Sequence, residues 1–439
     1  MKSSITAQSR VFRKAAVVAC ASPLVSPAVA QDHPIDRLSA EIEEQVIAWR
    51  RDFHQHPELS NREFRTAEVV AGELRGMGLE VETGIAHTGV VGYLRGARER
   101  PLVAIRADMD ALPVTEATGL PFASTVTTEF RGQQVGVMHA CGHDTHMAML
   151  LGAASNLVAL KEELPGSVLF IFQPAEEGAP AGEEGGAELM LKEGLFERHR
   201  PDAVFGMHAF ASLGTGKIGY RAGPIMASVD RFELTVRGRQ THGAMPWNGV
   251  DPIVTAAQIV TNVQTIVSRE VNLTRAPAVV TFGVINGGIR NNIIPDSVEL
   301  VGTIRNLDMD IRDRVHERLR TIVTNVAEAA GADAELRIIE QYPVTVNDPE
   351  LTRRMLPTLE RVVGRKNTVE EAPRMGAEDF SFFALEVPGF YVGLGVTPPD
   401  IDPATAPANH SPLFHVDEAA LVTGVRVLSH LALDYMNGE

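Results

Sequence analysis

The strongest constraint on the fold is an alternation of short apolar segments with helix-patterned segments across residues 34–217. Residues 102–106 and 168–173 are almost wholly apolar, as in strands that are buried on both faces. The segment 144–160 between them has the pattern of a helix, and residues 203–207 form a further apolar strand. Such alternation predicts an α/β domain with a mainly parallel sheet.

The pattern changes after Lys217. Residues 218–341 run strand, helix, strand, strand, helix, strand, which is the order of the split ferredoxin-like motif. From about Tyr342 the α/β pattern resumes and continues to the end of the chain. We therefore predict a ferredoxin-like (βαββαβ) domain, residues 218–341, inserted into a catalytic domain that is built from residues 31–217 and 342–439.

The N-terminus has the form of a secretory signal. Four basic residues precede a short apolar stretch that ends in Ala-Val-Ala at residues 28–30. We expect residues 1–30 to be a signal peptide cleaved after Ala30, which predicts a periplasmic or secreted protein. Lipoprotein processing at Cys20 and a cytoplasmic location are the alternatives. Cleavage would leave Cys141 as the only thiol, so an internal disulfide is not expected.

Charge and hydropathy exclude two classes of partner. The chain has 56 acidic and 40 basic residues, a formal net charge of −16, which disfavours binding to a polyanion such as nucleic acid. No apolar run approaches the roughly 18 residues of a membrane span. We therefore expect this chain of 439 residues to act on a small molecule and to have no membrane span.

The densest cluster of chemically active residues is HACGHDTH at 139–146, directly before the predicted helix. A thiolate and an imidazole in the Cys-Gly-His spacing, Cys141 and His143, suit a borderline-soft ion such as zinc. The alternative for this segment alone is a histidine-rich turn whose side chains are satisfied by hydrogen bonds.

Further polar residues follow the predicted strands. Glu176 and Glu177 come just after the strand 168–173, and His208 follows the strand 203–207. The carboxyl ends of strands are where open α/β sheets place their active sites. Because neighbouring side chains on an extended segment point in different directions, one glutamate can bind metal while the other moves a proton. We expect five metal ligands: Cys141, His143, Glu177, His208 and His410.

Motifs spread over nearly all of the chain after the signal resemble the co-catalytic zinc aminoacylase and carboxypeptidase superfamily. Within it, the chain is most similar to the hippurate hydrolase and auxin-conjugate (IAA-amino acid) amidohydrolase branch. The motifs, in order, are HQHPE at 54–58, RADMDALP at 106–113, MHACGHDTH at 138–146, FQPAEEG at 172–178, GMH at 206–208, THGAMP at 241–246, NNIIPD at 291–296, MGAEDF at 375–380 and HSP at 410–412.

The resemblance implies roles for the clustered residues. Cys141 would bridge two divalent metal ions, and Glu176 would be the general base that deprotonates the attacking water and then protonates the leaving amine. Asp108 would orient a ligand. Arg106 stands where the wider superfamily has a metal-binding histidine, and His143 is expected to compensate. Because a cysteine replaces the bridging aspartate of the wider family, zinc is our first choice, with manganese or cobalt as alternatives.

The resemblance also implies that the inserted domain forms a homodimer and acts as a lid. His242 would reach the partner subunit's site and stabilise the tetrahedral oxyanion. Asn291 or Asn292, together with Arg305, would hold the substrate carboxylate, Arg305 by a bidentate contact, and Gly376 would line the pocket. A structural or surface role is the alternative for each of them.

The resulting hypothesis is a metal-dependent amidohydrolase that cleaves an N-acyl-amino acid into a carboxylic acid and a free amino acid. A hippurate-like substrate with an aromatic acyl group is suggested by the resemblance alone, and acetyl groups are equally open. The nearest alternative is a metallo-carboxypeptidase or dipeptidase that uses the same site. A periplasmic binding protein and a metal-stabilised structural module are the alternatives from other classes.

Overall fold

The computed structural model describes residues 33–438. The predicted signal peptide, residues 1–30, and the alternative processing site at Cys20 lie outside the described residues, so export stays a prediction. Within residues 33–438, no helix combines the length and the apolar content that a membrane span requires.

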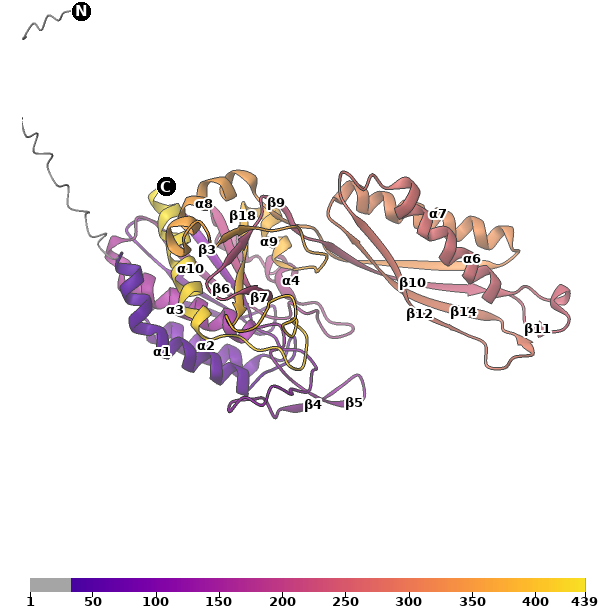
Figure 1. The fold of residues 1–439 in the computed structure, drawn as a ribbon, viewed down its shortest axis with the longest axis horizontal. Helices are drawn as coiled ribbons and strands as arrows, with labels where there is room; N and C mark the ends of the chain where they lie inside the picture. Colours follow the sequence, from indigo (N-terminus) through magenta and orange to yellow (C-terminus); the bar gives the residue numbers. More distant parts are fainter. Residues whose placement is uncertain (1–32, 439) are drawn as a thin grey trace, which may run out of the picture. The chain divides into compact units, whose positions relative to one another are not determined.

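A mixed eight-stranded sheet, in the order β1-β2-β6-β3-β7-β18-β8-β17, organises the first part of the fold (Figure 1). Its central strands β6, β3, β7 and β18 are all parallel neighbours, whereas β1 and β2 add an antiparallel edge and β8 runs antiparallel to β18. This confirms the predicted α/β class with a mainly parallel sheet. The strands are β1 (Glu80–Ile85), β2 (Gly89–Leu94), β3 (Leu102–Asp108), β6 (Ser167–Gln173), β7 (Ala203–Gly214), β8 (Ile218–Tyr220), β17 (Thr368–Glu370) and β18 (Gly389–Thr397).

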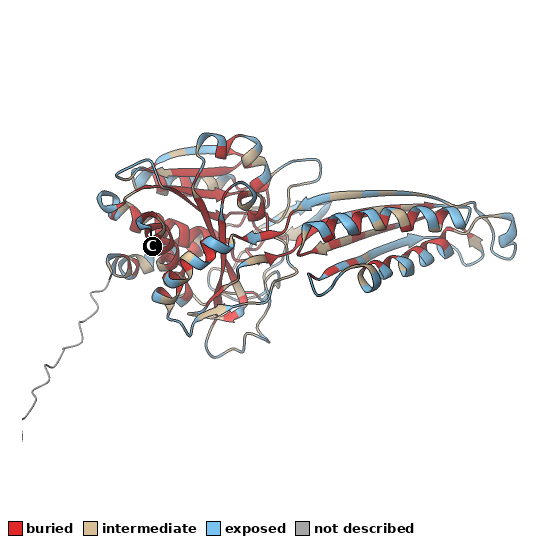
Figure 2. Ribbon diagram, turned by 90° about the horizontal axis from the view of Figure 1, so that it is seen from above, coloured by how far each residue is buried: buried red, intermediate tan, exposed pale blue. Residues whose placement is uncertain are grey.

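Both faces of this sheet are buried because its strands are apolar on both sides. Along β6, Val168, Phe170 and Phe172 belong to one hydrophobic cluster. The intervening Leu169 and Ile171 belong to another. This period of two is that of a strand packed on both faces. Figure 2 shows buried residues along these central strands.

Helices form a layer on each face. The first cluster draws on α1 (Pro34–Gln55), α2 (Phe64–Gly76), α3 (His143–Ala159), α8 (Pro349–Val363) and α10 (Ala419–Asn437). The second cluster draws on the short helices α4 (Gly186–Lys192), α5 (Leu195–Arg198) and α9 (Phe380–Glu386).

Helix α3 is buried almost all round, which explains its lack of a polar face. It packs against α1 and α10 as well as against the sheet. At Gly152 an added Cβ would meet Val425 at 2.7 Å and Val46 at 2.9 Å, so the three helices approach closely there. The predicted metal ligands Cys141 and His143 lie at the N-terminal end of this buried helix.

A second sheet has four antiparallel strands in the order β12-β14-β10-β15. Together with two helices it gives the sequence order β-α-β-β-α-β, which confirms the predicted ferredoxin-like motif. Helices α6 and α7 cover one face of the sheet (Figure 1). The elements are β10 (Ser228–Arg237), α6 (Pro252–Thr265), β12 (Ala278–Gly287), β14 (Ser297–Asn306), α7 (Met309–Ala329) and β15 (Asp333–Tyr342).

This second sheet has a hydrophobic core of its own, which includes Phe232, Ile259, Leu300 and Leu319. Each helix begins at an aspartate whose side chain accepts a backbone N–H: Asp251 caps α6 and Asp308 caps α7. Helix α6 is followed directly by a π-helical turn, Ile266–Glu270. The domain boundaries at residues 218 and 341 stay a prediction.

The remaining elements are short. Three small antiparallel ladders pair β4 with β5, β9 with β16 and β11 with β13. Two 3-10 turns cover Lys161–Glu163 and Pro246–Asn248. The short strands are β4 (Thr127–Phe130), β5 (Gln133–Gly136), β9 (Gly223–Met226), β11 (Thr241–His242), β13 (Ile293–Ile294) and β16 (Thr345–Asn347).

Candidate active site

The candidate site lies where the central strands of the eight-stranded sheet end. Strand β3 ends at Asp108, and β6 ends at Gln173, three residues before Glu176. His208 was expected at the end of a strand, but β7 continues to Gly214. The reason is its partner: β18 pairs with β7 as far as Gly214, whereas β3 pairs only as far as Gly206. His208 therefore lies two residues past the last β3–β7 pair, level with Asp108 at the end of β3.

The five predicted ligands come together around Cys141. Its Sγ lies 3.3 Å from Nε2 of His208 and 3.3 Å from Nε2 of His410. Oε1 of Glu177 lies 3.1 Å from Nε2 of His410. Two triads of donor atoms, each within 4.8 Å, share the cysteine: Cys141, His143 and His208, and Cys141, Glu177 and His410.

This arrangement fits a pair of metal ions. Zinc bonds to sulfur and nitrogen in a tetrahedral site would separate the two donor atoms by about 3.6 Å, close to the separations around Cys141. His143 donates from Nδ1 to the backbone oxygen of Asp110 at 2.8 Å. Its Nε2 is buried and has no hydrogen-bond partner among the described residues. A histidine that donates from one ring nitrogen to a carbonyl oxygen, and whose other ring nitrogen has no partner, is typical of a metal ligand.

The electrostatics of the cluster also favour a cation. Burial raises the pKa of the Cys141 thiol well above its usual range, and the Glu177 and Glu176 carboxylates raise it further. Burial lowers the pKa of His143, but Asp108 and Asp110 outweigh this effect and raise it to about 10. Divalent ions would displace both protons, as metal binding to cysteine and histidine requires.

Glu176 is buried beside the ligands and is free of any ion pair with arginine or lysine in the described part of the chain. Its Oε2 lies 3.8 Å from Nε2 of His143. Burial raises the pKa of Glu176 well above its usual range, and the nearby Glu378 carboxylate adds to the effect. A carboxyl group with this proton affinity can take up a proton and give it back.

Asp108 orients a histidine that we did not predict as a ligand. Its Oδ1 accepts from Nδ1 of His146 at 2.6 Å, and His146 Nε2 accepts from the backbone N–H of Ala209 at 2.8 Å. The other carboxylate oxygen of Asp108, Oδ2, accepts from Arg106 at 2.8 Å. Asp108 thus fixes the backbone next to His208, and its Oδ2 lies 3.7 Å from Nε2 of His143.

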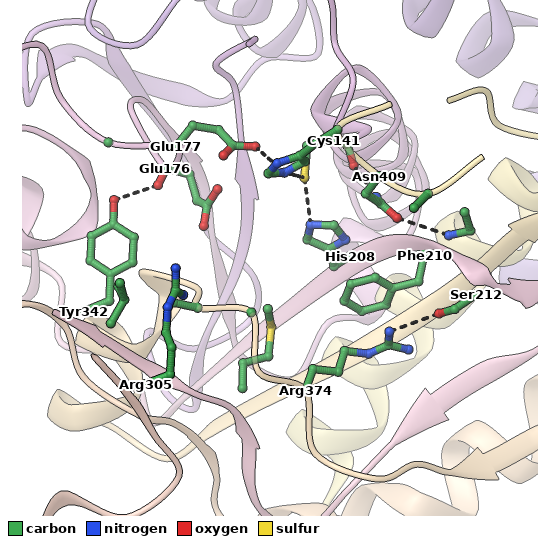
Figure 3. Close-up of a pocket in the computed structure, with 18 of the residues that line it drawn as sticks. Cys141, Glu176, Glu177, His208, Phe210, Ser212, Arg305, Tyr342, Arg374 and Asn409 are labelled. Atoms are coloured by element: carbon green, nitrogen blue, oxygen red, sulfur yellow. Dashed lines mark hydrogen bonds and ion pairs between the residues drawn. The ribbon is translucent and has the colours of Figure 1, made fainter. Parts of the chain in front are cut away.

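A cleft of about 740 Å³ opens over the cluster. Figure 3 shows Tyr342 and Arg305 on one side of Glu176, and His208, Phe210 and Arg374 on the other. Gly376, from the predicted loop, also lines the cleft. Among the described residues Arg305 forms no ion pair, and its Nε bonds only to Thr303 Oγ1, at 3.3 Å. Burial lowers the pKa of Arg305, and the charge of the Asp230 carboxylate offsets only part of this effect.

Three predicted site residues are not brought to the cleft within this chain. His242 is exposed on β11, and its Nδ1 accepts from the backbone N–H of Ala244. Asn291 and Asn292 are exposed in the turn before β13. None of the three lines the cleft.

Sequence reasoning missed an aromatic stack at the back of the cleft. The imidazole of His208 stacks on Phe210, and the Arg374 guanidinium lies 3.8 Å from the centroid of the same ring. Arg374 also bonds to Glu371 at 2.6 Å and to Ser212 at 3.0 Å. Phe210 was detectable in principle, because residues two apart on a strand share a face.

Comparison with known proteins agrees with this site. Residues 104–434 match the model of peptidase family M20/M25/M40, and the chain belongs to this family. It is 42% identical over 399 residues to "Thermostable carboxypeptidase 2" of Saccharolobus solfataricus, covering 90% of this chain and 97% of that protein.

Other relatives have different names. "N-acetyl-L-cysteine deacetylase" of Bacillus subtilis is 37% identical over 381 residues, covering 87% of this chain and 86% of the relative. "IAA-amino acid hydrolase ILR1-like 2" of Arabidopsis thaliana is 36% identical over 402 residues, covering 91% and 87%. These names confirm the resemblance to the aminoacylase and auxin-conjugate hydrolase branch.

Among solved structures, the YXEP protein of Bacillus subtilis is described as a dinuclear metal-binding peptidase of the M20 family. It superposes with a TM-score of 0.74 at 34% identity, covering 91% of this chain and 99% of that one. The present chain is therefore a hydrolase of amide bonds, with residues suited to binding metal ions.

Proposed function

We propose that this protein hydrolyses N-acyl-amino acids with two divalent metal ions, most simply zinc, in each subunit. The observation that carries the proposal is the layout of the cleft. The cluster around Cys141 lies in the middle, the Glu176 carboxyl lies beside it, and the Arg305 cation, which forms no ion pair among the described residues, lies at one end. A substrate with a carboxylate at one end and an amide near its middle matches this layout.

In the proposed reaction, Glu176 transfers the proton and Arg305 positions the substrate. When bound, the ions would polarise the scissile carbonyl and make a water molecule acidic enough to attack it near neutral pH. Glu176 takes the proton from the attacking water and delivers it to the nitrogen of the leaving amino acid. Arg305 binds the carboxylate of that amino acid through two parallel hydrogen bonds, which orients the amide over the cluster.

The opposite end of the cleft would accept the acyl group. It is lined by Phe210 and by small apolar side chains of the loop 403–408. One face of the Phe210 ring is covered by His208 and the other lies against the Arg374 guanidinium. Because both ring faces are occupied, an acyl group would meet the small apolar side chains of the loop 403–408. The Arg374 cation nearby would disfavour a peptide with a charged amino terminus.

A carboxypeptidase or dipeptidase activity is the second candidate. It is supported by the 42% identity to "Thermostable carboxypeptidase 2". A peptide would present the same terminal carboxylate to Arg305, so the two functions differ only in what occupies the other end of the cleft.

We also propose a homodimer and export from the cytoplasm. The exposed His242 is accompanied on its part of the fold by exposed apolar side chains, including Trp247 at 75% and Ile289 at 99% exposure. Exposed apolar groups of this kind are typical of an interface, and a second copy would supply His242 to the cleft as an oxyanion donor. Export rests on the sequence of residues 1–30 alone.

The test is a substrate panel. Metal-loaded protein is incubated with N-benzoyl-, N-acetyl- and indolylacetyl-amino acids and with dipeptides, with and without a chelator, and free amine is measured. Chelator-sensitive release from the acyl substrates supports the proposal, whereas release from dipeptides alone supports the peptidase. A matched acyl amino acid with its carboxylate converted to a carboxamide should be a poor substrate if Arg305 binds as proposed.

A further inference from the structure

The turn that carries Glu176 and Glu177 has an unfavourable backbone. Ala175, the residue before them, has a φ of +53°, in the left-handed region that residues with a Cβ rarely adopt. Such a conformation persists only where the surrounding structure enforces it. The contacts that enforce it here come from two buried carboxylates that no motif argument had assigned a role.

Three consecutive backbone amides of this turn donate to those carboxylates. The N–H of Ala175 donates to Glu63 Oε1 at 2.9 Å. The N–H groups of Glu176 and Glu177 donate to Oδ1 and Oδ2 of Asp110, both at 3.0 Å. Each oxygen of Asp110 therefore faces a different amide, so the carboxylate holds the two glutamates in a fixed relative orientation.

The remaining contacts of the two carboxylates tie the turn to the rest of the site. Oδ2 of Asp110 also accepts from Ser60 Oγ at 2.6 Å, and its backbone oxygen accepts from His143 Nδ1 at 2.8 Å. Oε2 of Glu63 accepts from Thr88 Oγ1 at 2.6 Å. Asp110 thus connects the turn to a second predicted metal ligand, His143.

Neither carboxylate is explained by a conventional ion pair. Asp110 is 1% exposed and Glu63 is fully buried. Among the described residues, no arginine or lysine forms an ion pair with either; the one ion pair involves His143 and Asp110 Oδ1, at 3.3 Å. Burying a carboxylate is costly unless hydrogen bonds compensate. Here the compensating donors include all three amides of the turn.

We propose that Asp110 and Glu63 are positioning residues that hold residues 175–177 so that Glu176 faces the scissile amide and Glu177 faces the metal ions. The inference rests on the proposed function in that Glu176 moves the proton and Glu177 binds metal. Neither positioning residue touches the substrate; each acts through the backbone of the turn.

The central variant is Asp110→Asn in the full-length, metal-loaded enzyme. The amide nitrogen that replaces one oxygen cannot accept from Glu176 or Glu177, so the turn loses one contact without a change in side-chain size. We expect kcat to fall about 100-fold, as displacements of about 1 Å cause, with KM little changed. We also expect metal retention against a chelator to weaken about 10-fold or more.

Glu63 provides a paired test with rescue. Glu63→Gln keeps an amide oxygen that accepts from the backbone N–H of Ala175. Its amide N–H can donate to the hydroxyl oxygen of Thr88, so kcat should stay within about threefold of wild type. Glu63→Leu removes the acceptor for the Ala175 N–H. We expect kcat to fall about 10-fold or more, because a partial loss of the turn's contacts should displace Glu176 by less than the roughly 1 Å that costs about 100-fold. Equal kcat values for Glu63→Gln and Glu63→Leu would overturn the role of Glu63, even if Asp110→Asn does not fold.

Glu58→Ala is the matched control. Glu58 also accepts two backbone amides, those of Arg65 and Thr66, but these lie in the first turn of α2 rather than in the site. Its loss should lower the melting temperature without changing kcat or metal retention. If Asp110→Asn changes only the melting temperature, as Glu58→Ala does, the positioning role is wrong.

The metal readout separates this inference from the proposed function. If wild-type protein cleaves no substrate in the panel, the proposed function fails. Weaker metal retention in Asp110→Asn than in Glu58→Ala would still support the positioning role, and equal retention would contradict it.

Discussion

His208 and Phe210 lie two residues apart on β7 and stack face to face, with ring centroids 4.3 Å apart and an interplanar angle of 17°. The stack restricts the imidazole ring of His208, whose Nε2 faces Cys141 Sγ. A ring held in this way keeps its nitrogen aimed at the metal position before an ion binds.

Phe210→Ala should therefore weaken metal binding although Phe210 is not a ligand. The loss of an orienting contact typically costs 10- to 100-fold in metal affinity, and we expect a loss of about 10-fold. Chelator competition followed by metal analysis measures it. Phe282→Ala, which removes a partly buried aromatic ring in the core of the second sheet, is the control, and equal retention in the two variants would contradict the role of the stack.

Cys141→Ser and Cys141→Asp should behave differently. Serine cannot supply an anionic ligand near neutral pH, so Cys141→Ser should lose metal and activity together. Aspartate is an anion that can bridge two ions, so Cys141→Asp should keep a larger share of both. Metal content per chain and turnover measure the difference. Two ions per chain and full turnover in Cys141→Ser would show that the thiolate is not needed.

Arg305→Gln should raise KM for acyl amino acids with a smaller effect on kcat. A hydrogen bond to a charged group contributes about 1.5–3 kcal/mol, which corresponds to roughly 10- to 100-fold in KM. Substrates without the carboxylate should not show this change. Arg231→Gln is the matched control, because Arg231 is an exposed arginine of the same sheet that pairs with Glu233. Equal KM values for the two variants would exclude Arg305 as the carboxylate receptor.

Glu63 should make the fold less stable as the pH rises. Burial, with the nearby Asp110 carboxylate, raises the pKa of Glu63 from 4.5 to about 7. The unfolded chain ionises from about pH 4.5 while the folded chain holds its proton until about pH 7, so stability is lost across this interval. Glu63→Gln removes that loss. Its melting temperature relative to wild type should therefore be higher at pH 8 than at pH 5, and a pH-independent difference would contradict the assignment.

Much of the site could be predicted from sequence because its ligands follow strands. Glu177 follows the end of the buried strand β6 by four residues, and Cys141 lies two residues before α3, so topology brings them to one edge. The end of β7, which lies at Gly214 and not before His208 as predicted, could not be predicted in this way. Whether a strand stops at His208 depends on how far β18 accompanies it, and this is a property of the partner strand.

The supporting residues could not be predicted in the same way. Asp110 and Glu63 bind backbone amides of residues 66 and 112 positions away in the chain. Backbone acceptors leave no signature in side-chain pattern, and a buried carboxylate looks the same in sequence as an exposed one. Tyr342, whose hydroxyl donates to the backbone oxygen of Glu176 at 2.7 Å, was expected only as a boundary residue.

The most direct test of the account is the turnover of Glu176→Gln together with its metal content. The substitution keeps the size of the side chain but removes the group that takes and returns the proton. We predict that turnover of the best acyl amino acid falls by about 10²- to 10⁴-fold, with the same number of metal ions bound as in the wild type. Near-native turnover in a fully loaded Glu176→Gln enzyme would contradict the account.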